Sequence, residues 1–173
     1  SSFDYVTIKY DANGNQLWDA LYNGPGNSTD IPTALAIDGL SNVYVTGTSY
    51  NSVTRDDYAT IKYDADGNQL WVAQYNGSGN FNNNASSLTV DSSGNVYVSG
   101  VSDGSPTYAT IKYDTWGNQL WVGLYNGNST WSSDIAVDDA GNIYVTGGSY
   151  GAETYYDYAT IKYSASGNQL WVA

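Results

Sequence analysis

The sequence predicts an all-β fold in which a four-stranded antiparallel sheet repeats about every 50 residues. Two aromatic columns define the repeat, because successive tyrosines and successive tryptophans are each 53, 50 and 50 residues apart. The composition agrees, since 18 Tyr, 6 Trp and 19 Gly with no Met favour short strands and tight turns over helices. The columns consist of Tyr5, Tyr58, Tyr108 and Tyr158, and of Trp18, Trp71, Trp121 and Trp171.

Each copy contains four short runs in which the residues alternate as they do in half-buried strands. In the second copy the runs span 58–63, 69–75, 87–91 and 96–99. Successive side chains of a strand point to opposite faces, so Trp71 and Tyr75 share one face and Leu70 lies on the other. Four strands per copy predict one small sheet per repeat.

Short polar sequences separate these runs. DANGN, DADGN, DTWGN and SASGN follow the first run, and DGLSN, DSSGN and DDAGN follow the third. Asp or Ser can accept a local backbone hydrogen bond and Gly supplies a positive φ, so each predicts a hairpin turn. Ser41 stands where Gly is expected and predicts a less relaxed turn. A calcium loop is not expected, because Gly14 and Gly67 come too early and no bidentate Glu follows.

The string D-x-x-G-N-V/I-Y-V-T/S-G, followed by A-T-I-K-Y-D-x-x-G-N-Q-L-W, resembles the SBBP beta-propeller repeat family of bacteria and archaea. The resemblance implies propeller blades whose innermost strands lie near 35–38, 88–91 and 135–138. It also implies an exported or cell-surface setting without a common catalytic motif. In this phase the chain, 1–173, is a single repeat domain with three full blades, at about 30–75, 85–125 and 134–173, and an N-terminal hairpin at 4–22.

Three blades are too few to close a ring, because propellers typically have about 4–8. The chain is therefore expected to be a fragment of a longer propeller, half of a dimeric ring, or a subunit whose hairpin completes a sheet in the next subunit. We expect a self-associating extracellular scaffold, in a filament or surface layer, since unpaired strand edges are sites of such contacts. The hairpin residues expected to mediate assembly are Tyr5, Ile8, Tyr10, Leu17 and Trp18.

Charge and composition exclude several functions. A net charge of −12 repels nucleic acid and anionic lipid, and no apolar run approaches the length of a spanning helix. The sequence has no Cys and no His, which removes the thiolate zinc ligands and the commonest general base. We therefore expect no enzyme, no catalytic residue, no metal and no cofactor.

A glycosidase with two carboxylates is the one enzyme that this composition leaves open. The paired acids Asp56-Asp57 and Asp138-Asp139 are its candidates. Neither pair recurs in all copies, so exposed loop acids explain them better.

Aromatic residues outside the repeat are the candidate ligand site for the alternative function, a carbohydrate- or protein-binding module. Flat aromatic side chains with a polar tip suit the apolar faces of sugars. Tyr50 is one such residue, and the remaining candidates are Trp116, Trp131, Tyr150, Tyr155 and Tyr156. The lysine column, in contrast, predicts ion pairs with nearby Asp residues or protection of strand edges, or a row of cations for an acidic partner; it consists of Lys9, Lys62, Lys112 and Lys162.

Four N-x-S/T sequons predict possible glycosylation of one rim of an exported chain. They lie in or beside the loop after the tryptophan strand, at Asn27, Asn76, Asn84 and Asn128. The sequence begins Ser1-Ser2 without Met, which suggests a processed chain from which a secretory signal has been removed. We therefore expect an extracellular or cell-surface location.

Overall fold

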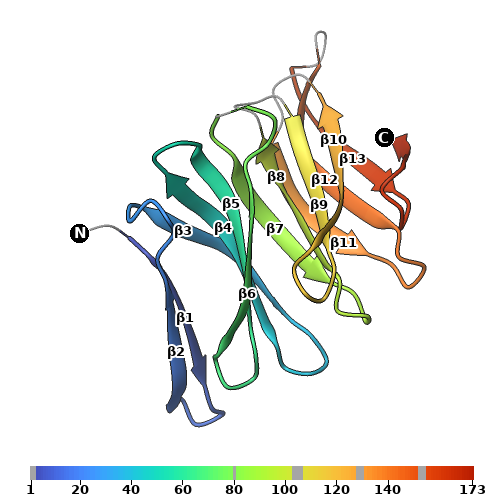
Figure 1. The fold of residues 1–173 in the computed structure, drawn as a ribbon. Coiled ribbons are helices and arrows are strands. Elements are labelled where there is room, and N and C mark those ends of the chain that lie inside the picture. The colour runs from blue at the N-terminus through green and yellow to red at the C-terminus, as the bar shows by residue number, and fades with distance from the viewer. Residues whose placement is uncertain (1–2, 80, 103–106, 128–130, 152–154) are drawn as a thin grey trace.

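The computed structural model describes residues 3–79, 81–102, 107–127, 131–151 and 155–173. Its regular structure in these ranges is entirely β-strand, which confirms the predicted all-β fold of three four-stranded sheets and one hairpin (Figure 1). We call the two-stranded sheet the half-blade and the others blades 1, 2 and 3. Because these ranges contain strands only, they hold no apolar helix of the kind that crosses a bilayer.

The strand bounds follow the repeat. The half-blade consists of β1 (Tyr5–Tyr10) and β2 (Gln16–Tyr22). Blade 1 consists of β3 (Asp30–Ile37), β4 (Val43–Asn51), β5 (Arg55–Tyr63) and β6 (Gln69–Tyr75). Blade 2 consists of β7 (Asn84–Val90), β8 (Val96–Ser102), β9 (Thr107–Tyr113) and β10 (Gln119–Asn126). Blade 3 consists of β11 (Trp131–Val137), β12 (Ile143–Gly151), β13 (Tyr155–Tyr163) and β14 (Gln169–Val172).

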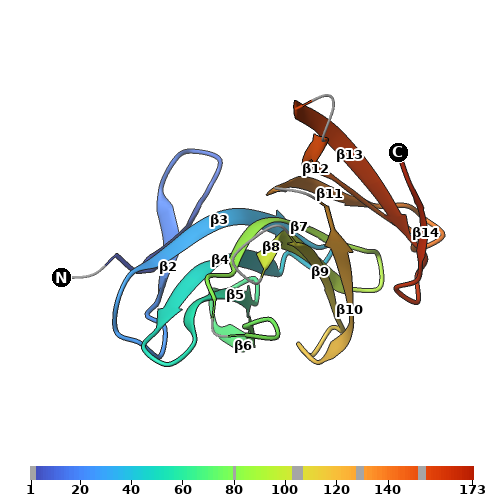
Figure 2. The same ribbon diagram turned by 90° about the horizontal axis from the view of Figure 1, so that it is seen from above.

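Each blade is an antiparallel meander in which consecutive strands pair. The first strands lie next to one another along the molecule, with β7 packed between β3 and β11. Figure 2 shows the sheets from above, following one another in chain order with the half-blade at the N-terminal end. In sequence, β1 corresponds to β5 and β2 to β6, so the half-blade is the outer half of a blade.

The Asp-x-x-Gly-Asn turns close their hairpins with a fixed set of hydrogen bonds. After β5, the Asp64 carboxylate accepts the N–H groups of Asp66 and Asn68 and the side-chain amide of Asn68, each at 2.9 Å. Gly67 donates its N–H to the Asp64 carbonyl at 3.1 Å and has a φ of +87°. These contacts confirm the predicted turns. Ser41 has a φ of +64°, a conformation strained by its Cβ, as its place in the turn predicts.

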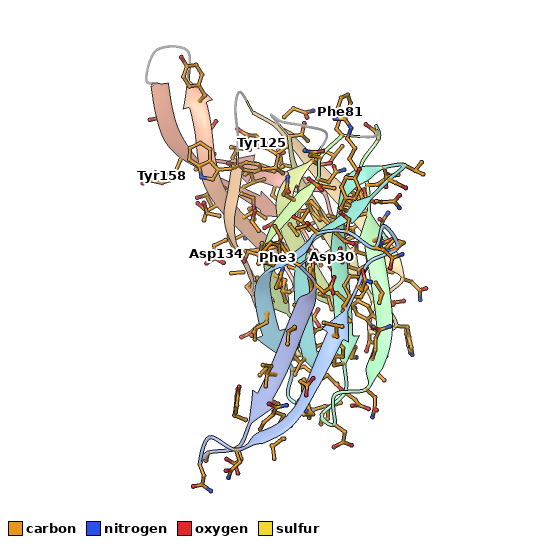
Figure 3. All side chains as sticks on the ribbon, turned by 90° about the vertical axis from the view of Figure 1, so that its left-hand side faces the viewer. Phe3, Asp30, Phe81, Tyr125, Asp134 and Tyr158 are labelled. Atoms are coloured by element: carbon orange, nitrogen blue, oxygen red, sulfur yellow. The ribbon has the colours of Figure 1, made fainter. Side chains whose placement is uncertain are left out.

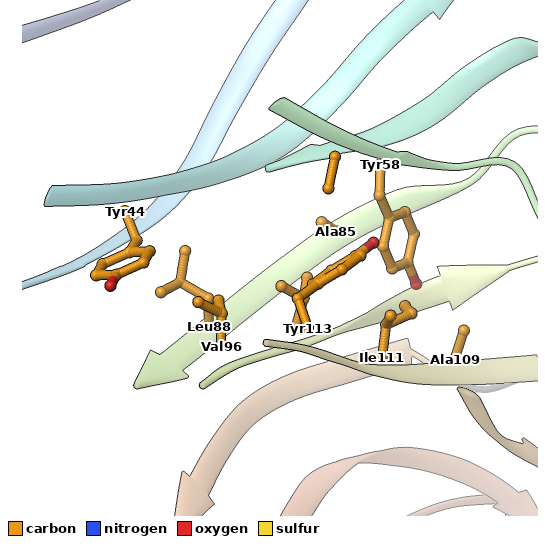
Figure 4. Close-up of a cluster of buried hydrophobic side chains, with 10 residues drawn as sticks. Tyr44, Tyr58, Ala85, Leu88, Val96, Ala109, Ile111 and Tyr113 are labelled. Carbon is orange, nitrogen blue, oxygen red and sulfur yellow. The ribbon is translucent and has the colours of Figure 1, made fainter. Parts of the chain in front are cut away.

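The core lies between the sheets, because each blade buries its apolar face against the next. Between blades 1 and 2, Tyr44 and Tyr58 pack with Leu88, Val96 and Ile111 (Figure 4). Burial of each such side chain contributes roughly 1.5–3 kcal/mol. Equivalent clusters fill the junction of the half-blade with blade 1 and that of blade 2 with blade 3.

Each internal tryptophan of the column joins its blade to a turn of the next one. The Trp71 Nε1–H donates to the Thr115 carbonyl at 3.1 Å, and the Trp71 ring packs on Tyr113 with centroids 6.4 Å apart. A Cβ on Gly117 would lie 2.8 Å from the Trp71 ring, so only glycine fits under it. The same contacts join Trp18 to Ala65 and Gly67, and Trp121 to Ala165 and Gly167.

Three members of the tyrosine column add a second contact between neighbouring sheets. Each is 0% exposed, and its hydroxyl lies against a glycine on the second strand of the next blade. A Cβ on that glycine would approach the hydroxyl to 2.6–2.7 Å. The pairs are Tyr5 with Gly47, Tyr58 with Gly100, and Tyr108 with Gly147.

The lysine column contacts backbone and aromatic rings, so the predicted ion pairs with Asp are wrong for the described residues. Lys62 is 6% exposed, donates to the Thr115 carbonyl at 3.3 Å, and lies 5.1 Å from the Tyr44 ring centroid. Lys9 likewise donates to the Ala65 carbonyl at 2.8 Å. The physical reason is that each turn Asp is already saturated by its own turn, whereas the carbonyl of the next blade is within reach.

Candidate functional site

A groove of about 650 Å³ lies between blades 1 and 2, on the side of the molecule where the longer loops leave the strands. Blade 1 contributes the loop before β3 and parts of β3, β4 and β5, and blade 2 contributes the start of its innermost strand, β7. The volume falls in the range of about 300–1,000 Å³ that is usual for small-molecule sites. The lining residues are Ser28, Thr29, Ile31, Thr33, Thr48, Tyr50, Asp56, Asn84, Ala85 and Ser86.

The groove presents both an acceptor and a donor. The half-buried Asp56 carboxylate accepts no hydrogen bond from the described residues, although its backbone carbonyl accepts the N–H of Asn83 at 2.7 Å. Asn84 accepts the Thr48 hydroxyl at 3.0 Å through its Oδ1. The Nδ2 group of Asn84 donates no hydrogen bond to any of the described residues. A ligand in the groove would therefore meet the Asp56 carboxylate as an acceptor and the Asn84 amide as a donor.

An aromatic ring lies beside these polar groups. Tyr50, near the end of β4, is 37% exposed, and its backbone N–H donates to the Thr29 carbonyl at 3.3 Å. Ile31, 52% exposed on the neighbouring strand, adds an apolar contact surface. The main chain of Tyr50 is therefore anchored to the loop before β3, and its side chain borders the groove.

The chemistry of this groove is specific to blades 1 and 2. Val101 occupies the repeat position of Thr48 in the next junction, and Trp131 occupies that of Asn84. Trp131 pairs across the sheet with Gly148, and a Cβ on Gly148 would collide with the indole ring. The second junction therefore replaces the amide and hydroxyl with apolar groups.

Apart from Tyr50, the aromatic residues singled out in the sequence lie outside this lining. Trp116 is 75% exposed in the turn before β10, and Trp131 is 47% exposed at the start of β11. Tyr150 lies on β12 at the repeat position that Tyr50 occupies in blade 1. Tyr155 and Tyr156 begin β13, and their side chains fall outside the described residues. Tyr50 is the aromatic residue from that set that borders the groove.

The four sequons lie in different surroundings. The Asn27 side chain accepts the amide of Asn23 at 3.0 Å, and Asn27 has a φ of +45°. Asn76 is half-buried after β6. Asn84 lines the groove, so a glycan there would occupy it. Asn128 falls outside the described residues.

The five assembly candidates divide into two groups. Tyr5 is fully buried and Trp18 is half-buried, because both already pack against blade 1. Ile8, Tyr10 and Leu17 are 43%, 55% and 57% exposed. The sequence showed that the hairpin lacks inner strands but did not show that it docks on the next blade of its own chain.

A row of buried polar residues crosses blade 1 behind the groove. Asp30, Ser49 and Asp57 lie opposite one another on β3, β4 and β5 and are 1%, 0% and 3% exposed. Gly24 donates its N–H to Asp30 at 2.7 Å, and the Thr54 hydroxyl donates to Asp57 at 2.5 Å.

Burial raises the pKa of Asp57 above its usual 3.8; the Thr54 hydrogen bond opposes this rise, and the charge of Asp56 adds to it. Blade 2 has the neutral residues Asn83, Ser102 and Thr107 in the same row, with Ser102 donating to Asn83 at 2.9 Å. The described residues contain no group of three or more His, Cys, Asp or Glu side chains that could hold a metal.

Fold and sequence together define a protein built from β-propeller repeats. The SBBP beta-propeller repeat profile matches residues 18–53, 70–106 and 119–152, and the chain belongs to this family. No curated protein matches the chain. A solved structure that resembles it is a fucose lectin from Kordia zhangzhouensis in complex with methyl-fucoside. The two are 14% identical with a TM-score of 0.42, over 81% of this chain and 96% of that one.

Proposed function

We propose that this chain is a non-catalytic glycan-binding propeller module and that the groove between blades 1 and 2 holds the sugar. The observation that carries the proposal is the free Asp56 carboxylate and the Asn84 amide beside the exposed ring of Tyr50. Sugar hydroxyls both donate and accept hydrogen bonds, and the C–H face of a pyranose packs well on an aromatic ring. Glycans would be met outside the cytoplasm, and we propose that the protein works there.

The groove favours binding over hydrolysis. Glycosidases place two carboxyl groups on either side of the scissile bond, at about 5–10 Å from each other. The lining of the groove contains one carboxylate, Asp56. The neighbouring Asp57 is buried in the sheet and accepts the Thr54 hydroxyl. A second acid suited to glycosidase chemistry is therefore missing from this site.

A glycan array followed by calorimetry with the best monosaccharide tests the proposal. Tyr50→Ala and Asp56→Asn should each weaken binding roughly tenfold, which corresponds to about 1.4 kcal/mol. Trp116→Ala is the matched control, because Trp116 is 75% exposed and lies outside the groove. An array without signal, or binding that both groove variants retain, would overturn the proposal.

A self-associating scaffold is the second candidate function, and the apolar side of the half-blade favours it. Val6, Ile8 and Leu35 are 54%, 43% and 63% exposed and border a second groove of about 420 Å³ between β1 and β3. Exposed apolar surface that forms a contiguous patch marks an interaction site. Light scattering after size-exclusion chromatography tests this candidate, and a chain that stays monomeric at high concentration would contradict it.

A further inference from the structure

Two halves of the blade-to-blade junction are exposed at opposite ends of the molecule. The tyrosine that lies under the tryptophan in each internal junction is 1–2% exposed, as for Tyr63, Tyr113 and Tyr163. Tyr10, the corresponding residue of the half-blade, is 55% exposed. A Cβ on Gly14 would meet nothing within 4 Å, whereas Gly67, Gly117 and Gly167 are each covered by an indole ring. The half-blade turn is therefore an unoccupied copy of an occupied site.

The opposite end has the complementary surface. Trp171 is the fourth member of the tryptophan column and is 42% exposed. Its ring packs on Tyr144 of its own blade, with centroids 6.1 Å apart, as the ring of Trp71 packs on Tyr44. Lys162 lies over the same Tyr144 ring, as Lys62 lies over Tyr44. Blade 3 thus holds the donor side of a junction in the arrangement that the internal junctions have, and its Trp171 ring is partly exposed.

We propose that two copies of this chain associate head to tail, with Trp171 of one copy docking on the 11–15 turn of the next. This inference rests on the self-associating scaffold proposed above and specifies the residues through which two copies contact each other. The Trp171 Nε1–H would donate to the Ala12 carbonyl, as Trp18 donates to Ala65 at 3.0 Å. The Trp171 ring would cover Gly14 and pack on Tyr10, so the contact continues an interface that the chain forms three times internally.

Sequence similarity between the turns supports this fit. The half-blade turn reads DANGN and the blade 1 turn reads DADGN, and Gly14 has a φ of +83° where Gly67 has +87°. The receiving surface therefore has the shape that Trp18 already recognises. Such a contact is heterologous, so repeated copies form a ring or a filament.

The contact involves the outer half of blade 3. Tyr5, Tyr58 and Tyr108 each pack on a glycine of the second strand of the next blade. The half-blade consists of the counterparts of a blade's third and fourth strands, so its described residues offer no such glycine. Tyr158, the fourth member of that column, is 82% exposed and lies at the outer side of the last sheet (Figure 3). We expect it to stay outside the contact.

Complementation of two variants tests the proposal on the full chain. The experiment is sedimentation velocity at physiological ionic strength, where the Debye length of about 8 Å screens repulsion between acidic copies. Trp171→Ala removes the donor side and Tyr10→Ala removes the receiving side. Each should weaken self-association roughly 30-fold, the expected effect of truncating an interface hot spot. An equimolar mixture should restore one intact junction and form a 1:1 dimer.

The controls separate this contact from folding defects and from other modes of assembly. Both exchanged residues are exposed, so far-UV circular dichroism should be unchanged, and Trp116→Ala should associate like the wild type. A monomeric wild type, or variants that remain assembled, would overturn the proposal, as would a mixture that forms no dimer. Assembly that survives both changes would leave the scaffold function standing while this contact fails, and glycan binding by Trp171→Ala is measured independently.

Discussion

The two ends of blade 1 shift the pKa values of their carboxyl groups in opposite directions. At the turn end, hydrogen bonds from Asn68 and from backbone N–H groups lower the pKa of Asp64. At the loop end, burial raises the pKa of Asp57. The turn is repeated in most hairpins, whereas the row formed by Asp30, Ser49 and Asp57 in blade 1 contains two acidic residues and its counterpart in blade 2 contains none. The repeated turns therefore stabilise the fold in the same way in successive blades. The residues at the loop ends differ from blade to blade, as is expected of a binding surface.

The largest expected effect comes from the turn end. Gly117→Ala should destabilise the protein by about 2–4 kcal/mol, because a Cβ strains the positive φ and collides with the Trp71 ring. Gly14→Ala is the control with the same backbone strain and open space, and it should cost about 1 kcal/mol. Chemical denaturation measures both, and equal losses would show that the tryptophan cover adds nothing.

A smaller effect, with the opposite sign, is expected at the loop end. The pKa of Asp57 is raised in the folded state, so its contribution to stability is greatest below its ordinary pKa and is lost as the pH rises through the folded value. Asp57→Asn should therefore raise the melting temperature by about 2–4 °C at pH 7, with the gain disappearing in acid. Thermal melts between pH 3 and pH 8 test this, and a gain that persists in acid would contradict the assigned cause.

The smallest effect is expected from the same exchange in the turn. Asp64 has a lowered pKa, so the stability it contributes is present above its ordinary pKa and is lost as the pH falls through the folded value. Asp64→Asn should lower the melting temperature slightly at pH 7 and match the wild type in acid. The same series of melts applies, and a variant more stable than the wild type at pH 7 would remove the contrast between the two ends.

Local features of this fold could be predicted from the sequence. Alternating runs and Asp-x-x-Gly-Asn turns determine strands and hairpins within a few residues, and the SBBP resemblance implied that the strands form four-stranded propeller blades. The strained turn at Ser41 was also visible as a missing glycine. These features depend on neighbours along the chain, which a single sequence displays.

Contacts between blades could not be predicted in the same way. The partner of Lys62 is a carbonyl 53 residues away, and the groove combines Tyr50 with Asn84 across two sheets. The lysines recur with the repeat, but their period does not show which group of the next blade they contact, and the pairing of Tyr50 with Asn84 leaves no periodic signal. One signal was present for the groove, since the sequence singled out Tyr50 as a candidate ligand residue. The structure places Tyr50 on β4, at the repeat position of Tyr150, and its neighbour Asn84 belongs to a different copy.

Nearest-neighbour packing has a consequence for how the chain opens. The described contacts join each sheet to the one before and the one after it, so blade 2 is held by two full blades while blade 3 is held on one side. In such linear arrays unfolding begins at the ends and spreads inward. Amide hydrogens of β8 and β9 should therefore exchange with solvent most slowly, and those of β14 much faster. This pattern would show that the last strand opens locally before the chain unfolds as a whole.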